Sequence, residues 1–193
     1  MTSRDKILTA VKLAQPGFIP LEDKLSETGH VGDVNRFTSV LESIGGKAFL
    51  ISNIEEVLPS VEKMFPNVSR IISAISSLNK YQLIDKNVRH HTFHDADVVI
   101  LEAQFGVAEN GAVWLTEDNY KLRVLPFIGE HLVMIVHATT LVGNMHQAYQ
   151  LIAGADYGFG VFIAGPSKTA DIEQSLVLGA HGPKTMTVFV IVN

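Results

Sequence analysis

The 193-residue chain contains no cysteine, and this absence removes several kinds of chemistry at once. Disulfide bonds, thiolate nucleophiles and zinc-finger sites all need cysteine, so none of them can form within the chain. Iron–sulfur clusters are held by cysteine thiolates, so this chain cannot ligate a cluster in that way. We therefore expect a fold that depends on its apolar residues, with no metal and no cofactor.

Basic residues and long apolar runs are also scarce. The 15 lysines and arginines against 20 acidic residues give a net charge of -5, without a basic run. Nucleic-acid binding needs a basic footprint, so we expect no nucleic-acid partner. No apolar stretch approaches the ~20 residues that span a bilayer. The N-terminus also lacks the apolar core of a signal peptide. We therefore expect a cytoplasmic protein without a membrane partner.

The composition is that of a globular protein, with 47% hydrophobic and 18% charged residues. A length of 193 residues fits one domain of ordinary size. No repeat, low-complexity segment or clear linker divides the chain. We therefore expect a single domain over residues 1–193, in which residues 1–32 form a helix and an irregular segment.

The first half of the chain alternates between helical and strand patterns. Apolar residues at helical spacing predict a helix in the first ~20 residues, stopped by Pro16-Gly17. A second helix is predicted to begin after an N-cap at Asp33 and to end at Gly45-Gly46. A strand at 48–51, a helix capped by Ser52 or Asn53, and a strand at 70–74 follow. This alternation predicts an α/β fold with a mostly parallel or mixed sheet and flanking helices.

The second half contains short apolar runs that are separated by turn residues. We expect strands at 97–103, 112–116, 122–125 and 132–137, followed by a helix at 144–152. A strand at 161–164, a short helix at 170–178 and a final strand at 187–192 complete the prediction.

The segment 165–173 is the first candidate site, because a predicted strand passes through a Gly-Pro turn into a predicted helix. A helix N-terminus presents unpaired N–H groups and partial positive charge, so a carboxylate or phosphate could bind there. The residues that would contact such a ligand are Gly165, Ser167, Lys168, Thr169, Asp171 and Glu173. The alternative is structural, with Ser167 or Thr169 as the helix cap and both acids favouring the helix dipole.

The second candidate is the turn from Gly106 to Gly111. Glycines allow close approach of backbone to a ligand, and Glu109 could act as an acid, a base or a nucleophile. The alternative is a plain hairpin, with Asn110-Gly111 in a type I′ turn and Glu109 in solvent.

Histidines provide two further candidates. His181 could point into the site at 165–173 or cap the preceding helix, and His131 is similarly ambiguous. Residues 89–97 hold three histidines and two aspartates, which could ligate a metal. Their spacing matches no catalytic metal pattern, so we expect a solvated loop there.

Three segments of the chain resemble the sequence pattern of the LUD-domain family, lactate-utilisation protein C type. The C-terminal segment reads Gly165-Pro-Ser-Lys-Thr-Ala-Asp-Ile-Glu173 and continues as Leu176-Val-Leu-Gly179-Ala-His181-Gly-Pro183. The turn Gly106-Val-Ala-Glu109-Asn-Gly111 and the segment from Leu125-Pro126 to Val133 are also similar. Asn110 stands where the family usually has Thr, and Lys168 stands where Arg is common.

The resemblance implies a fold of the NagB/RpiA/CoA-transferase type. It also implies a non-redox subunit or accessory protein of a system that oxidises L-lactate to pyruvate, alongside iron–sulfur partner proteins. A small carboxylate or similar anion would bind near Lys168. The alternatives are a free-standing enzyme, akin to the isomerases, CoA transferases and folate cyclo-ligase of this fold group, and a pure interaction module.

Overall fold

A six-stranded parallel sheet forms the centre of the computed structural model, which describes residues 2–17, 19–20, 32–78, 82–83, 89–120, 122–169 and 177–192. The strand order is β1-β12-β7-β4-β2-β3. The bounds are β1 (Lys47–Ile51), β12 (Thr185–Ile191), β7 (His131–His137), β4 (Val98–Glu102), β2 (Ile71–Ser73) and β3 (Gln82–Leu83). The sequence prediction of an α/β fold with a parallel sheet is thus confirmed.

Strand β4 shows why this sheet is buried on both faces. Val98, Val99, Ile100 and Leu101 are all fully buried, although consecutive residues of a strand point to opposite faces. Val98 and Ile100 pack into one apolar cluster, whereas Val99 and Leu101 pack into another. Such a continuous apolar run is typical of a central parallel strand covered on both sides.

A second sheet of four strands packs beside the first. Its order is β8-β5-β6-β9, with β8 (Leu141–Val142), β5 (Phe105–Val107), β6 (Ala112–Thr116) and β9 (Gly160–Ile163). The largest apolar cluster joins side chains of both sheets, for example Met134 of β7 and Leu115 of β6. The main core therefore lies between the two sheets.

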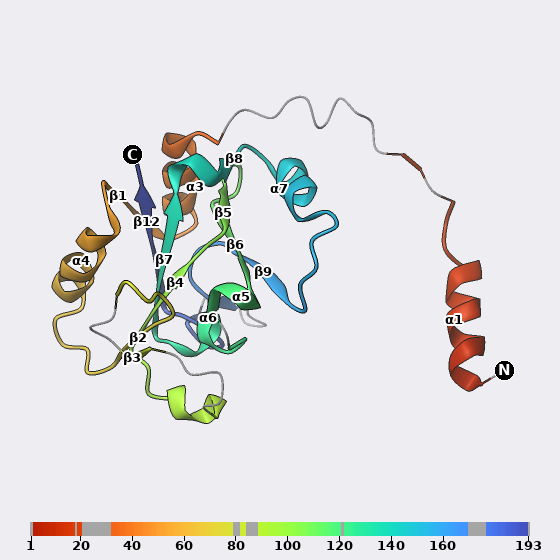
Figure 1. Cartoon of the computed structure of the whole chain (residues 1–193), viewed down its shortest axis with the longest axis horizontal. Helices are drawn as coiled ribbons and strands as arrows, with labels where there is room; N and C mark the ends of the chain where they lie inside the picture. The colour runs from red at the N-terminus through yellow and green to blue at the C-terminus, as the bar shows by residue number, and fades with distance from the viewer. Residues whose placement is uncertain are drawn as a thin grey trace.

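Helices cover the remaining faces (Figure 1). Helix α3 (Val34–Ser43) and the short helices α5 (Glu117–Tyr120) and α6 (Leu125–Ile128) contribute to the core between the sheets. Helix α4 (Val57–Met64), preceded by the 3-10 turn η1 (Ile54–Glu56), covers the other face of the large sheet. Helix α7 (Met145–Ile152) covers the outer face of the small sheet, so α4 and α7 lie on opposite sides of the molecule.

The first helix, α1 (Ser3–Leu13), is confirmed but is shorter than the sequence suggested. Thr2 and Asp5 form a capping box at its N-terminus. None of its residues is buried, and Ile7, Leu8 and Val11 are each more than half exposed. Within the described ranges, no helix combines the length and the apolar character that crossing a membrane requires.

Two expected elements differ in the structure. Residues 122–124 form a turn that leads into α6, where a strand was expected. Pro126 lies in the first turn of α6, where its fixed φ favours a helix and its missing N–H costs nothing. Residues 170–176 of the expected helix at 170–178 lie outside the described residues. Its end is not helical, because β11 (Val177–Leu178) pairs with β10 (Lys168–Thr169).

Tyr120 provides a test of the core between the sheets. Its side chain is fully buried, and its hydroxyl has no hydrogen-bond partner among the described residues. Burial raises the pKa of Tyr120 to about 12, because the charged form would lose its water. Since an unpaired buried hydroxyl is costly, Tyr120→Phe should raise the free energy of unfolding by about 1 kcal/mol.

Denaturation with urea measures this change. The matched control is Tyr149→Phe, because the Tyr149 side chain is 60% exposed and its hydroxyl lies within reach of solvent. We expect no change in stability for the control. A loss of stability in Tyr120→Phe would contradict the prediction.

Candidate functional site

The carboxyl ends of parallel strands are the usual ligand site of open α/β sheets. A cavity of about 460 Å³, here called the carboxyl-edge pocket, opens beside the ends of β4 and β7. Gln104 enters its lining two residues after β4, and Thr139 and Thr140 of the 3-10 turn η3 (Ala138–Thr140) follow β7 directly. The pocket thus lies over the small sheet, next to the segments that follow β4 and β7.

The walls of the carboxyl-edge pocket are largely apolar. Phe105, Trp114 and Tyr157 form an aromatic side, and the Trp114 and Tyr157 rings meet edge to face at 5.5 Å. Aliphatic side chains complete the walls, namely Leu141, Val142, Leu151 and Ile152. These residues come from the small sheet and from the end of α7, so the packing of α7 shapes the pocket.

Several polar groups at the pocket are hydrogen-bonded within the chain. The Gln104 amide donates to the Thr116 hydroxyl at 3.0 Å, and that hydroxyl donates to Asn119 Oδ1 at 3.2 Å. The Thr140 hydroxyl donates to the His137 carbonyl at 2.9 Å. Asp118 and Asp156 are exposed at the pocket and add two carboxylates.

Glu102 and His137 end β4 and β7 at the same edge of the sheet. His137 Nε2 lies 3.7 Å from Glu102 Oε1, and both side chains are partly exposed. A carboxylate beside an imidazole is an arrangement that can move protons. The sequence analysis missed both residues, although each is the first polar residue after a buried apolar run.

A second cavity, of about 580 Å³, lies at the opposite edge of the large sheet and is here called the amino-edge pocket. His181 lines it together with His94, Asp95 and Asp97, which are distant in sequence. Lys184 and Glu130 also line it and form an ion pair with each other. This pocket therefore mixes charges of both signs.

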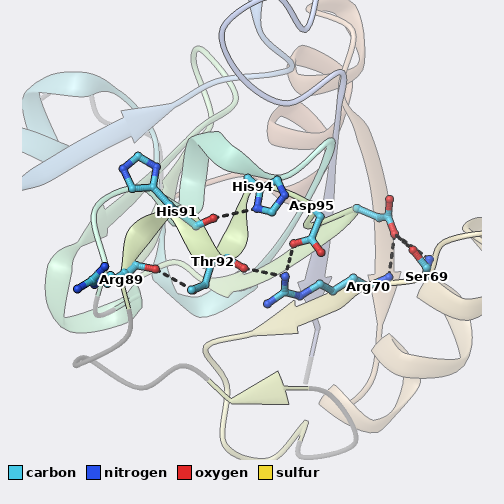
Figure 2. Close-up of polar contacts among 8 residues, drawn as sticks. Ser69, Arg70, Arg89, His91, Thr92, His94 and Asp95 are labelled. Carbon is cyan, nitrogen blue, oxygen red and sulfur yellow. Dashed lines mark hydrogen bonds and ion pairs between the residues drawn. The ribbon is translucent and has the colours of Figure 1, made fainter.

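Polar contacts within the chain hold the histidine-rich loop at residues 89–97 (Figure 2). Arg70 donates to the Thr92 carbonyl at 2.7 Å and pairs with the carboxylate of Asp95. The His94 ring contacts the His91 carbonyl through Nδ1 at 2.9 Å, and the His91 ring points away from Asp95. Among the described residues, no three potential ligands gather closely enough to hold a metal.

His131, at the start of β7, is built into the structure. Its Nδ1 lies 2.9 Å from the Thr185 hydroxyl, and its ring stacks on Phe65 with centroids 4.5 Å apart. Burial lowers the pKa of His131, because the protonated ring would lose its water. The neutral ring is therefore favoured in the folded chain.

The turn at residues 106–111 packs against α3. Val107 pairs with Ala112 across the hairpin, which leaves four residues in the turn instead of the two of a type I′ turn. A Cβ on Gly106 would lie 2.6 Å from Leu141 Cδ2, and one on Gly111 would lie 2.9 Å from the Leu41 backbone. Glu109 accepts a hydrogen bond from the Met145 N–H at 2.9 Å, at the N-terminus of α7. Local packing and capping thus occupy these residues.

The segment at residues 165–169 also packs against the end of α3. Gly165 has a φ of +71°, and a Cβ there would lie 3.1 Å from the Ile44 carbonyl oxygen. Lys168 donates to that same carbonyl, as a cation at the C-terminus of a helix often does. The backbone of Thr169 pairs with Val177, whereas Asp171 and Glu173 lie outside the described residues.

The described candidate residues therefore lie at different places. Glu109 contacts α7, Lys168 contacts α3, and His181 lines the amino-edge pocket. Ser167 lies near the loop that carries His181. Its N–H donates to the Pro183 carbonyl, and a Cβ added to Gly182 would lie 3.1 Å from the Ser167 Cβ. Whether any of these residues binds a ligand stays a prediction.

The close approach of α3 to the turn at residues 106–111 can be tested at Gly111. Its φ of +67° strains any other residue, and a methyl group would also meet the Leu41 backbone. Gly111→Ala should therefore lower the free energy of unfolding by about 2–4 kcal/mol.

Gly154→Ala is the matched control for Gly111→Ala. Gly154 has a φ of +77°, and a Cβ there would meet nothing within 4 Å. Thermal unfolding should show a loss of about 1 kcal/mol for this variant. Equal losses in the two variants would mean that contact with α3 plays no part.

Asp97 gives a test in acid. It accepts hydrogen bonds from the N–H groups of Arg70 (2.8 Å) and Ser69 (2.7 Å) and from the Ser69 hydroxyl (3.0 Å). The bond from the Arg70 amide is the largest cause that lowers the pKa of Asp97 below 3.8. Its stabilising effect is present above that value and is lost as the pH falls through the lower pKa of the folded chain.

We expect Asp97→Asn to be about 1–2 kcal/mol less stable at pH 7, with the difference shrinking below a pH of about 3.8. Urea denaturation at pH 7, 5, 4 and 3 measures this. Ser69→Ala should lose less stability and keep the acid dependence, because both N–H donors remain. A difference that is constant across these pH values would contradict the prediction.

Comparisons with known proteins bear on this arrangement. The LUD domain family matches residues 73–191. Lactate utilization protein C 1 of Bacillus mycoides is 38% identical over 104 residues, which are 51% of this chain and 44% of that protein. Lactate utilization protein C of Shouchella clausii is 40% identical over 94 residues, which are 46% of this chain and 41% of that protein. Each alignment therefore covers less than half of the relative.

A solved structure agrees on the fold. It is a DUF162 family protein from Deinococcus radiodurans, with a TM-score of 0.62 over 82% of this chain and 96% of that chain. At 16% identity, this likeness shows the fold alone. The match to the LUD domain covers more than half of the chain. It includes the large and the small sheet except for strand β1 and the first residues of β2. The chain therefore belongs to the LUD domain family.

Proposed function

We propose that this chain is a non-redox accessory protein of a system that oxidises L-lactate to pyruvate. The observation that supports it is the LUD domain at residues 73–191, together with relatives that are named lactate utilization protein C. The electrons of lactate oxidation need carriers, and a chain without cysteine offers no thiolates for an iron–sulfur cluster. The proposed partners are therefore iron–sulfur proteins of the same system.

The proposed ligand is a small carboxylate bound beside the segment at residues 165–169. Ser167 lies against the loop that carries His181 and Lys184, which supplies polar and cationic groups. Lys168 is exposed, and its ammonium contacts the Ile44 carbonyl. A bound carboxylate would compete with the Ile44 carbonyl for the Lys168 ammonium, because a charged acceptor makes a stronger hydrogen bond than a neutral carbonyl.

The second candidate function is a free-standing enzyme of this fold group. The observation that favours it is the Glu102–His137 pair, which lies where β4 and β7 end. Glu109, the acid proposed from the sequence, would have to release the Met145 N–H before its carboxylate could contact a substrate. The accessory role needs no such rearrangement.

Growth on L-lactate tests the accessory role. In the organism that encodes this chain, with other lactate dehydrogenases deleted, loss of the gene should abolish growth on L-lactate. Growth on pyruvate should remain, because pyruvate enters metabolism after the oxidation step. Normal growth on L-lactate without the gene would overturn the proposed role.

Plasmid copies in the same strain test the proposed anion site. The wild-type chain should restore growth, and Lys168→Ala should restore it poorly if Lys168 holds the carboxylate. Lys63→Ala is the control, because it removes an exposed lysine of α4, far along the chain from the proposed site. Equal growth with both variants would leave the accessory role standing and remove Lys168 from the site.

A further inference from the structure

The carboxyl-edge pocket has an unbalanced charge. Asp118 and Asp156 belong to its lining, and no lysine, arginine or histidine of the described chain does. Arg123, which follows α5, comes near Gly158 but is outside the lining and is already paired. Its Nε lies 2.9 Å from Glu117 Oε2, and its guanidinium lies over the Phe159 ring at 5.3 Å. The two carboxylates at the pocket therefore have no cation of this lining to balance them.

The hydrogen bonds of the lining leave both acceptors and donors for a ligand. The Thr140 hydroxyl proton and one N–H of the Gln104 amide serve contacts within the chain. The acceptors at the pocket include the Gln104 carbonyl and the two carboxylates, and the donors include the second Gln104 N–H and the hydroxyls of Thr139 and Tyr157. The two carboxylates, rather than the neutral groups, therefore decide the charge of the ligand.

The remaining walls set the size and character of the ligand. A cavity of about 460 Å³ has room for a body the size of an aromatic ring with a short side chain. Phe105, Trp114 and Leu151 offer apolar surface to such a body. Aromatic faces also attract cations through their quadrupole.

From this combination we propose that the carboxyl-edge pocket binds an organic cation, a protonated amine on an apolar body. The amine donates to the carboxylates of Asp118 and Asp156, and the body lies against the aromatic side. This site goes beyond the proposed role in lactate oxidation, because L-lactate and pyruvate are anions.

Trp114 makes the site directly observable, since it is the one tryptophan of the chain and lies in the pocket wall. The full chain is titrated at low ionic strength with three probes of similar shape, and Trp114 emission is followed. The probes are 2-phenylethylammonium, neutral 2-phenylethanol and anionic 3-phenylpropionate. We expect saturable binding of the ammonium, about tenfold tighter than the alcohol and tighter still than the carboxylate.

Asparagine variants test the two carboxylates. Asp118→Asn and Asp156→Asn should each weaken the ammonium about threefold, and the double variant should bind it no better than the alcohol. Glu42→Gln is the control, because it removes one negative charge from α3, outside the pocket lining. It should change the affinity by less than about 1.5-fold.

A charge introduced at the pocket provides a second test that does not depend on the aspartates. Leu151 is 57% exposed at the end of α7, so Leu151→Lys should fold and should shift the preference toward 3-phenylpropionate. Gln150→Lys adds the same charge one residue away, outside the lining, and should keep the preference for the ammonium. The proposal is overturned if the carboxylate binds the wild-type chain as tightly as the ammonium. It is also overturned if the double variant binds the ammonium as tightly as the wild-type chain does. A third contrary outcome is that no probe changes Trp114 emission at concentrations up to about 10 mM.

Discussion

The close approach of α3 to the small sheet is the contact on which the rest of the structure depends. Leu41 and Ile44, one helical turn apart, meet the turns at Gly111 and Gly165 almost backbone to backbone. The pairing of Val113 with Ile163 places these two turns at the same end of the small sheet. A side chain at either position would push α3 outward and open the core between the sheets. Glycines that resemble a ligand-binding motif therefore have a sufficient explanation in packing.

The sequence predicted the large sheet well because its central strands are continuous apolar runs. β4, β7 and β12 were all expected near their observed bounds, as was α7 after its cap at Asn144. The strand expected at 122–125 was wrong, because three apolar residues around Arg123 do not distinguish a strand from a short helix. The proline that follows it was the signal that favoured a helix.

The candidate site was harder to predict, because pockets form from residues that are distant in sequence. Gln104, Asp118, Thr140 and Asp156 carry no motif, and they meet because α7 packs on the small sheet. Glu109 and Lys168 carried the motif but serve as partners of α7 and α3 in the folded chain. Local sequence patterns predicted most helices and strands, whereas the cavity depends on how these elements pack together.

The two pockets have different electrostatic characters, and this difference bears on the accessory role that we propose. The amino-edge pocket pairs Lys184 with Glu130, so its charges are largely balanced within the chain. The carboxyl-edge pocket leaves two carboxylates without such a balance. Two carboxylates disfavour anions such as L-lactate, so the organic cation proposed for this pocket differs in kind from the substrate of the proposed system. If that ligand and a partner protein favour the same arrangement of α7, each must strengthen the binding of the other by the same factor. The pocket would then couple binding of an organic cation to binding of the partner, and the proposed accessory role would need no redox chemistry within the chain.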